Sequence, residues 1–176
     1  MIMKRVWLMF VLSLFSFTLF AEEAAPAKKK VDFNNVRRWG RNTCARSSSI
    51  KWDDKEKAIV VTADFKDRTE NCWCYPTFRF RPNEDISKAT GIRYDIKLGA
   101  DSYALTGSHL VMLKISDLEK NKYLKVENAG DEWKTVTVKF NETSEELKKA
   151  SYINIGMHSE DQVLVFMLRN IELVTE

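Results

Sequence analysis

The sequence is poor in the residues that metal and redox chemistry use. It has two histidines and three cysteines among 176 residues. Structural zinc sites usually take four Cys or His ligands at short spacings, and no such spacing occurs here. The C-x-x-C pair of thiol redox enzymes is also absent. These absences exclude a recognisable zinc site and a thioredoxin-like active site.

Motifs of the common catalytic sites are missing as well. The sequence has no G-x-S-x-G nucleophile elbow, no H-E-x-x-H metalloprotease helix and no glycine-rich phosphate loop. Carboxylates occur in many expected turns, so a glycosidase-like pair of acids stays open. From these absences and the small size we expect a protein that is not an enzyme.

No apolar segment is long enough to span a bilayer as a helix. Residues 6–20 carry no charge, but a transmembrane helix needs about 20 apolar residues. Lys4 and Arg5 precede this segment and Ala21 follows it, which is the pattern of a secretory signal peptide. A retained membrane anchor is the alternative. We expect cleavage after residues 1–21, no stable membrane insertion afterwards, and a secreted or periplasmic protein.

The expected mature chain has no excess of positive charge. Loss of Lys4 and Arg5 lowers the 28 basic residues to 26, against 25 acidic residues, and the net charge falls from +3 to +1. Proteins that bind nucleic acids usually have a strongly basic face, so we expect no nucleic-acid partner. Residues 22–30 (EEAAPAKKK) predict a flexible leader, and residues 31–176 are enough for one core.

The sequence does contain alternating apolar and polar residues between turn signals, which is typical of β-strands. The clearest case is residues 91–99, where Ile92 and Tyr94 alternate with Arg93 and Asp95. Strands are expected at residues 47–52, 58–65, 72–80, 91–99, 109–116, 122–127, 132–140, 151–158 and 162–174. The first two flank a polar turn and predict a hairpin.

Almost no helix is expected. One short helix is predicted at residues 144–150, with Ser144 as its cap. Together with about nine strands, this predicts an all-β fold: an antiparallel two-sheet jelly-roll β-sandwich with one short helical turn. Strand alternation predicts a buried core that includes Ile92, Tyr94, Ile96, Val136, Val138, Phe140, Phe166 and Leu168.

The order of these segments resembles a known family. The matching stretches are AIVVTADF (58–65), DISKATGIRYDIK (85–97), EWKTVTVKF (132–140), INIG (153–156) and FMLRNIEL (166–173). Over residues 58–174 they are similar to jelly-roll carbohydrate-binding modules with a galactose-binding-like fold. The resemblance implies that fold and a glycan or polysaccharide partner.

The cysteines of a secreted chain are expected to form a disulfide. Cys72 and Cys74 on one strand would be about 6.6 Å apart with parallel side chains, which is poor geometry for a bond between them. Cys44 is therefore expected to pair with Cys72 or Cys74, and either partner remains open.

The stretch NCWCYPTFRF (71–80) is the main candidate for a ligand surface. Strand alternation places one set of side chains toward the core: Cys72, Cys74, Phe78 and Phe80. The opposite set is Trp73, Tyr75, Thr77 and Arg79. Aromatic faces cover the apolar side of a sugar ring, and guanidinium groups bond its hydroxyls. Pro76 could introduce a bulge that swaps the faces, and Trp73 and Tyr75 could instead pack in the core.

Other candidate ligand-binding residues are Asn154 and Arg169, with His158 as a weaker candidate on the same surface. Arg169 is expected on the outer face of the last strand. Trp39 could cover an end of the sandwich or close a ligand cleft.

Some modules of the resembled family hold a structural calcium ion. Calcium prefers oxygen ligands, and the available carboxylates are those of Asp32, Asp53, Asp54, Asp64 and Asp67. The acidic position near the last strand corresponds to Asn170 here. We therefore expect these aspartates to be solvated turn charges, and no cofactor.

Two functions follow from these observations. The first is a secreted, non-catalytic carbohydrate-binding protein. The second is a structural or protein-interaction β-sandwich of the envelope or extracellular space without a sugar site. An exposed aromatic cluster on a sheet face would favour the first function, and the same aromatic side chains packed inward would favour the second.

Overall fold

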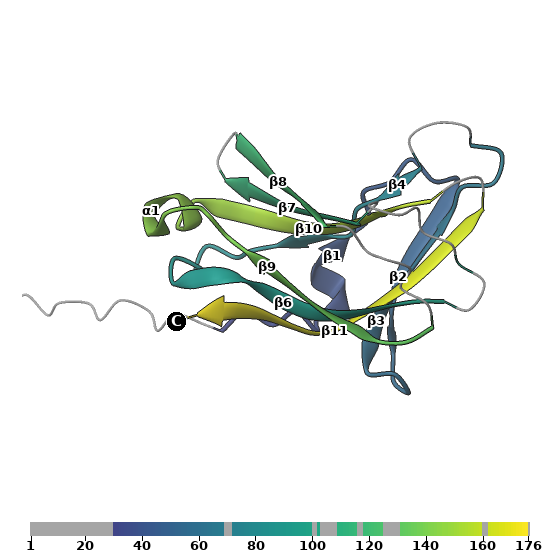
Figure 1. Cartoon of the computed structure of the whole chain (residues 1–176), viewed down its shortest axis with the longest axis horizontal. Coiled ribbons are helices and arrows are strands. Elements are labelled where there is room, and N and C mark those ends of the chain that lie inside the picture. Colours follow the sequence, from purple (N-terminus) through teal and green to yellow (C-terminus); the bar gives the residue numbers. More distant parts are fainter. Residues whose placement is uncertain are drawn as a thin grey trace, which may run out of the picture.

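Two antiparallel β-sheets lie face to face in this structure, a computed structural model (Figure 1). It describes residues 30–68, 72–99, 102, 109–115, 118–124, 131–159 and 162–175. The elements are η1 (Val36–Arg38), β1 (Trp39–Gly40), β2 (Ser47–Asp53), β3 (Ala58–Asp64), β4 (Trp73–Cys74), β5 (Thr77–Arg79), β6 (Ala89–Leu98), β7 (His109–Ile115), β8 (Leu118–Leu124), β9 (Lys134–Lys139), α1 (Ser144–Leu147), β10 (Ala150–His158) and β11 (Val163–Thr175).

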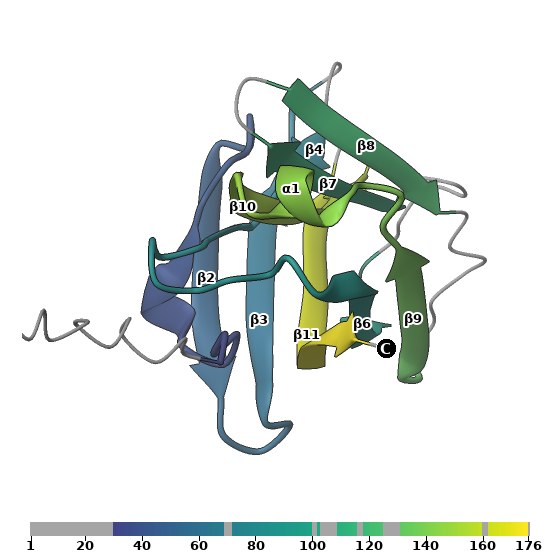
Figure 2. The ribbon, with the colours of Figure 1, turned by 90° about the vertical axis from the view of Figure 1, so that its left-hand side faces the viewer.

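The strand order confirms the predicted sandwich. Sheet A has the order β1–β5–β10–β7–β8, and β4 also pairs with β10. Sheet B has the order β2–β3–β11–β6–β9, which Figure 2 shows from left to right. The expected hairpin of the first two long strands is present, because β2 pairs with β3 along its whole length. The predicted all-β jelly-roll class is therefore confirmed.

Alternation along the central strands builds the core. In β6 the side chains of Ile92, Tyr94 and Ile96 are fully buried, while Arg93 and Asp95 face outward. Six of the eight predicted core residues are buried: Ile92, Tyr94, Ile96, Val138, Phe166 and Leu168. Val136 and Phe140 are only partly buried against the core. Both lie on or next to β9, which is the edge strand of sheet B.

Several element boundaries differ from the prediction. The single strand expected at residues 72–80 is two short strands, and β8 begins at Leu118. Strands β8 and β9 belong to different sheets, so they do not form a hairpin with each other. The helix is capped by Thr143 instead of Ser144, because Thr143 and Glu146 form a reciprocal capping box.

The segment before β2 packs into the core. The Trp39 side chain is 6% exposed, and its Nε1 donates to the Phe33 carbonyl at 2.8 Å. Arg38 forms a largely buried ion pair with Glu84 and lies 4.2 Å from the centre of the Phe78 ring. Of the two roles considered for Trp39, the structure shows packing, because its indole has little surface left for a ligand.

A polar contact crosses the core between the sheets. Tyr94 on β6 and His109 on β7 are both fully buried, and the Tyr94 hydroxyl lies 2.7 Å from His109 Nε2. His109 Nδ1 has no hydrogen-bond partner among the described residues. Burial lowers the pKa of His109 from its ordinary value of 6.5 to about 4.

The expected signal peptide lies outside the described residues, as does nearly all of the leader. Across the described ranges, none of the helices has the length and apolar character needed to cross a membrane.

The buried histidine predicts acid-sensitive stability. Between pH 6.5 and about 4, unfolded chains bind a proton at position 109 that folded chains do not bind. The free energy of unfolding should therefore fall by about 3 kcal/mol as the pH falls through this window. Urea unfolding at several pH values measures it. His109→Gln should flatten this part of the profile, whereas His158→Gln should keep it. Equal profiles for both variants would contradict the prediction.

Phe166 should be a major contributor to stability, because its side chain is fully buried in the centre of sheet B. Phe166→Ala should lower the free energy of unfolding by about 3–5 kcal/mol. Phe140→Ala should cost clearly less, since Phe140 is only partly buried. Urea unfolding of both variants tests this order, and the reverse order would show that Phe140 contributes more to the core than Phe166.

Candidate functional site

Residues 73–79 pair with β10 in one unbroken register. The partners are Trp73–His158, Cys74–Met157, Thr77–Asn154, Phe78–Ile153 and Arg79–Tyr152. No residue is inserted between the two short strands, so Tyr75 lies opposite Gly156. The bulge considered from the sequence does not occur, and the two faces keep the predicted alternation.

Pro76 interrupts the hydrogen bonds of this strand without shifting it. Proline has no N–H to donate, while its carbonyl accepts from the Ile155 N–H at 3.3 Å. The Tyr75 N–H donates to the Asn42 carbonyl at 2.7 Å, on the side away from β10. The strand around Tyr75 is thus held between β10 and the segment that precedes β2.

The predicted division of this stretch into two faces is confirmed. Cys72, Cys74 and Phe78 are buried in the core. On the other face, Trp73 and Tyr75 are half-buried and Arg79 is exposed, whereas Thr77 is only 7% exposed. The aromatic side chains therefore lie on the outer face of sheet A and are not packed inward.

Three rings form an aromatic cluster on this outer face: Trp73, Tyr75 and His158. The Trp73 and Tyr75 rings are stacked, with centroids 5.3 Å apart and planes within 8°. The His158 ring is tilted against Trp73 at 5.0 Å. Gly156 makes room for this arrangement, because a Cβ atom there would lie 2.4 Å from Tyr75 Cδ1.

Beside the aromatic cluster lies a buried amide. Asn154 is 2% exposed, and its Nδ2 lies 3.7 Å from Met112 Sδ, a weak acceptor. Its Oδ1 has no hydrogen-bond partner among the described residues. A buried acceptor without a donor costs about 1–3 kcal/mol, so this carbonyl oxygen favours any donor that can reach it.

Charged residues flank Tyr152 at the opposite end of the face. Arg79 and Lys114 are its direct neighbours on β5 and β7. The Tyr152 hydroxyl donates to Glu119 Oε1 at 2.9 Å, across β7. Partial burial and this hydrogen bond raise the pKa of Tyr152. The tyrosine ring is thereby fixed across the sheet.

Arg169 does not share this surface, so the expectation that it lies with Asn154 on one surface is wrong. It lies on β11 in sheet B, whereas Asn154 lies on β10 in sheet A. Its guanidinium is 4.0 Å from the Trp133 ring centre and pairs with Asp95 at 3.5 Å. Outward side chains of the two sheets face opposite directions, which separates these two residues.

The expected disulfide is not formed in the structure. No disulfide joins Cys44, Cys72 or Cys74. Cys72 and Cys74 both point into the core, where the Cys72 thiol contacts the Arg68 carbonyl at 3.6 Å. Burial raises the pKa of the Cys74 thiol to about 12, which disfavours its reactive thiolate form.

Three of the five aspartates considered for calcium cap turns. The side chains of Asp32, Asp53 and Asp64 each accept a hydrogen bond from a backbone N–H two residues later. Asp67 pairs with Arg46. Within the described ranges, no group of three His, Cys, Asp or Glu side chains could hold a metal ion.

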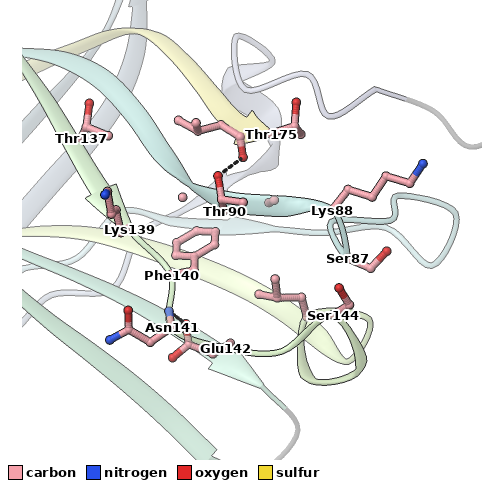
Figure 3. A pocket seen from close by; sticks show the side chains of 14 residues that line it. Ser87, Lys88, Thr90, Thr137, Lys139, Phe140, Asn141, Glu142, Ser144 and Thr175 are labelled. Carbon is pink, nitrogen blue, oxygen red and sulfur yellow. Dashed lines mark hydrogen bonds between the residues drawn. The ribbon is translucent and has the colours of Figure 1, made fainter.

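A separate hollow of about 840 Å³ lies beside α1 (Figure 3). Its lining includes Phe140, the hydroxyl side chains of Thr90 and Ser144, and Lys88 and Lys139. The Thr90 hydroxyl already donates to the Val174 carbonyl at 3.3 Å. The buried polar atoms that lack partners lie elsewhere, so this hollow is a weaker candidate than the outer face of sheet A.

The sequence analysis overlooked several residues of this face. Tyr152 and Gly156 alternate with buried residues of β10, as Asn154 and His158 do. The same alternation could therefore have placed them on one surface. Lys114 and Glu119 join the face only through the pairing of β7 with β8, which alternation along a single strand does not reveal.

Comparisons with known proteins support the fold. No known family model matches the sequence, and no curated protein sequence matches it. Similar solved structures include the family 11 carbohydrate-binding module of the cellulosomal cellulase Lic26A-Cel5E of Clostridium thermocellum. It has a TM-score of 0.56 and 18% identity, over 87% of this chain and 97% of that chain.

Two further solved structures are similar. The family 11 module from Clostridium thermocellum in complex with a β-1,3-1,4-mixed-linked tetrasaccharide has a TM-score of 0.56 and 18% identity, over 84% of this chain and 95% of that one. The CBM22-2 xylan-binding domain of Paenibacillus barcinonensis Xyn10C has a TM-score of 0.53 and 9% identity, over 85% and 100%. At these identities the likeness establishes the jelly-roll fold alone.

Gly156→Ala should displace Tyr75 from its stack with Trp73, because the new methyl group would overlap the tyrosine ring. The expected results are an altered near-ultraviolet circular dichroism spectrum and a loss of about 1–3 kcal/mol in unfolding free energy. Gly40→Ala is the control, since a Cβ there would meet only the Thr77 carbonyl at 3.7 Å. Identical spectra and stabilities for the two variants would rule out the tight contact.

Proposed function

We propose that this protein is a secreted, non-catalytic carbohydrate-binding protein that holds a glycan against the outer face of sheet A. The observation that carries the proposal is the partly exposed aromatic cluster of Trp73, Tyr75 and His158. Aromatic side chains that only stabilise a sandwich are expected between its sheets, and these lie outside them.

The chemistry of the face suits a sugar. A pyranose ring has an apolar C–H side, which an indole or phenol ring covers, and polar hydroxyls around its rim. Thr77, Asn154 and Arg79 follow the aromatic cluster on the same face. Asn154 Oδ1 could accept a hydrogen bond from a sugar hydroxyl, although the side chain is only 2% exposed. A shallow site of this kind is expected to bind with a dissociation constant of about 10 µM to 1 mM.

The remaining parts of the proposal rest on the sequence. Residues 1–21 act as the secretory signal, residues 22–30 as a flexible leader, and residues 31–176 as the binding domain. After cleavage the domain is secreted or periplasmic. The lack of catalytic motifs in the sequence supports a binding role.

Trp73→Ala should abolish detectable glycan binding and leave the fold nearly intact, because Trp73 supports little of the core. Binding of the mature domain is first mapped on a glycan array and then measured by isothermal titration calorimetry. Trp133→Ala is the matched control, since Trp133 is equally half-buried but lies against Arg169 and Lys97 of sheet B.

Two outcomes would overturn this function. The first is the absence of any glycan ligand for the folded domain, which would favour a structural or protein-interaction role. The second is an equal loss of binding in both tryptophan variants. Unfolding of Trp73→Ala would likewise count against the proposal, because it would show that Trp73 is a packing residue.

A further inference from the structure

The outer face of sheet A changes character along β10. Its aromatic end, around Gly156 and His158, presents the rings of Trp73 and Tyr75. Four residues along β10 from Gly156, the row at Tyr152 presents charged side chains instead. Four residues of a strand span about 13 Å, which is more than one sugar ring covers. A bound chain of several sugars would therefore meet both environments.

The row at Tyr152 consists of Tyr152 and its neighbours on the adjacent strands, and a cation lies on each side of the tyrosine. Arg79 and Lys114 are directly opposite Tyr152 on its two neighbouring strands. Their backbones are therefore about 10 Å apart. Both side chains belong to the outer face, so a group placed over the tyrosine ring lies within reach of both.

Arg79 differs from the paired arginines of this chain. Arg38, Arg46, Arg93 and Arg169 each pair with a carboxylate. Arg79 is exposed, and among the described residues no carboxylate or carbonyl group binds its guanidinium. A guanidinium binds carboxylate and sulfate groups through two parallel hydrogen bonds. The group best suited to this position is thus an anion.

The acidic residue of the row is already engaged. Glu119 accepts the hydrogen bond of the Tyr152 hydroxyl and lies beyond Lys114, on the side of the row away from Arg79. Among the described residues, the row carries two cations and one carboxylate. Glu119 is the direct neighbour of Lys114, and Arg79 lies at the other end of the row, on the strand line that leads to Trp73 and Tyr75.

We propose that the glycan is anionic: Arg79 and Lys114 bind a carboxylate or sulfate group of one sugar over Tyr152, while a neighbouring sugar stacks on the aromatic cluster. This inference rests on the proposed function and names the class of its ligand. An aromatic cluster that binds only neutral sugars would need no cation in this row, so the two cations distinguish the outer face of sheet A from such a site.

The test compares matched oligosaccharides by isothermal titration calorimetry on the mature domain. The probes are oligogalacturonate, a sulfated oligosaccharide, and neutral xylo- and cello-oligosaccharides of equal length. Arg79→Gln and Lys114→Gln each remove one charge from the row, and Lys139→Gln removes the same charge from sheet B as a control. Since each contact is a charge-assisted hydrogen bond, binding of the acidic probe should weaken about tenfold in the first two variants.

Three results decide the inference. Preferential binding of an acidic probe, weakened by added salt and by both row variants but not by Lys139→Gln, would support it. The better acidic probe would tell a carboxylate from a sulfate ligand. Equal binding of neutral and acidic probes, unchanged in Arg79→Gln, would overturn it and leave the glycan function standing. Binding of no probe and no arrayed glycan would instead remove the proposed function itself.

Discussion

The unbroken register between residues 73–79 and β10 fixes which side chains reach each side of sheet A. Side chains alternate along a strand, so one inserted residue would send the rings of Trp73 and Tyr75 into the core and the cysteines into solvent. Pro76 does not cause this shift, because it removes only one donor from the ladder. The Tyr75 N–H is satisfied by Asn42 instead. Core and candidate site thus depend on the same pairing.

In this strand, different side chains stabilise the core and form the candidate binding surface. Phe78 and the two cysteines of this strand contact the core, while the rings of Trp73 and Tyr75 stack on each other and Tyr75 lies against Gly156. Among the described residues Asn154 Oδ1 has no hydrogen-bond partner, and burial of such an oxygen is unfavourable. Arg169 Nε in sheet B and His109 Nδ1 in the core also lack a hydrogen-bond partner among the described residues, so the aromatic cluster, and not this oxygen, distinguishes the outer face of sheet A.

Much of the fold could be predicted from the sequence, because alternation in segments such as residues 91–99 reflects burial of one strand face. The same reasoning correctly placed Trp73 and Tyr75 outside the core, whereas Asn154 is only 2% exposed. It failed for Arg169, since alternation shows that a side chain points outward but not from which sheet. The disulfide and the helix cap failed for a related reason: both depend on local geometry around Cys44 and Thr143 that composition does not encode.

Tyr75 and Gly156 form a steric pair across two strands, and this has a consequence for how such a surface evolves. Neither residue can change freely alone: a side chain at position 156 needs a smaller partner at position 75, and loss of the ring at position 75 removes the constraint on the glycine. Among descendants of this chain the two positions should therefore vary together. The pair of residues found at positions 75 and 156 would show, from sequence alone, which relatives have kept the aromatic cluster.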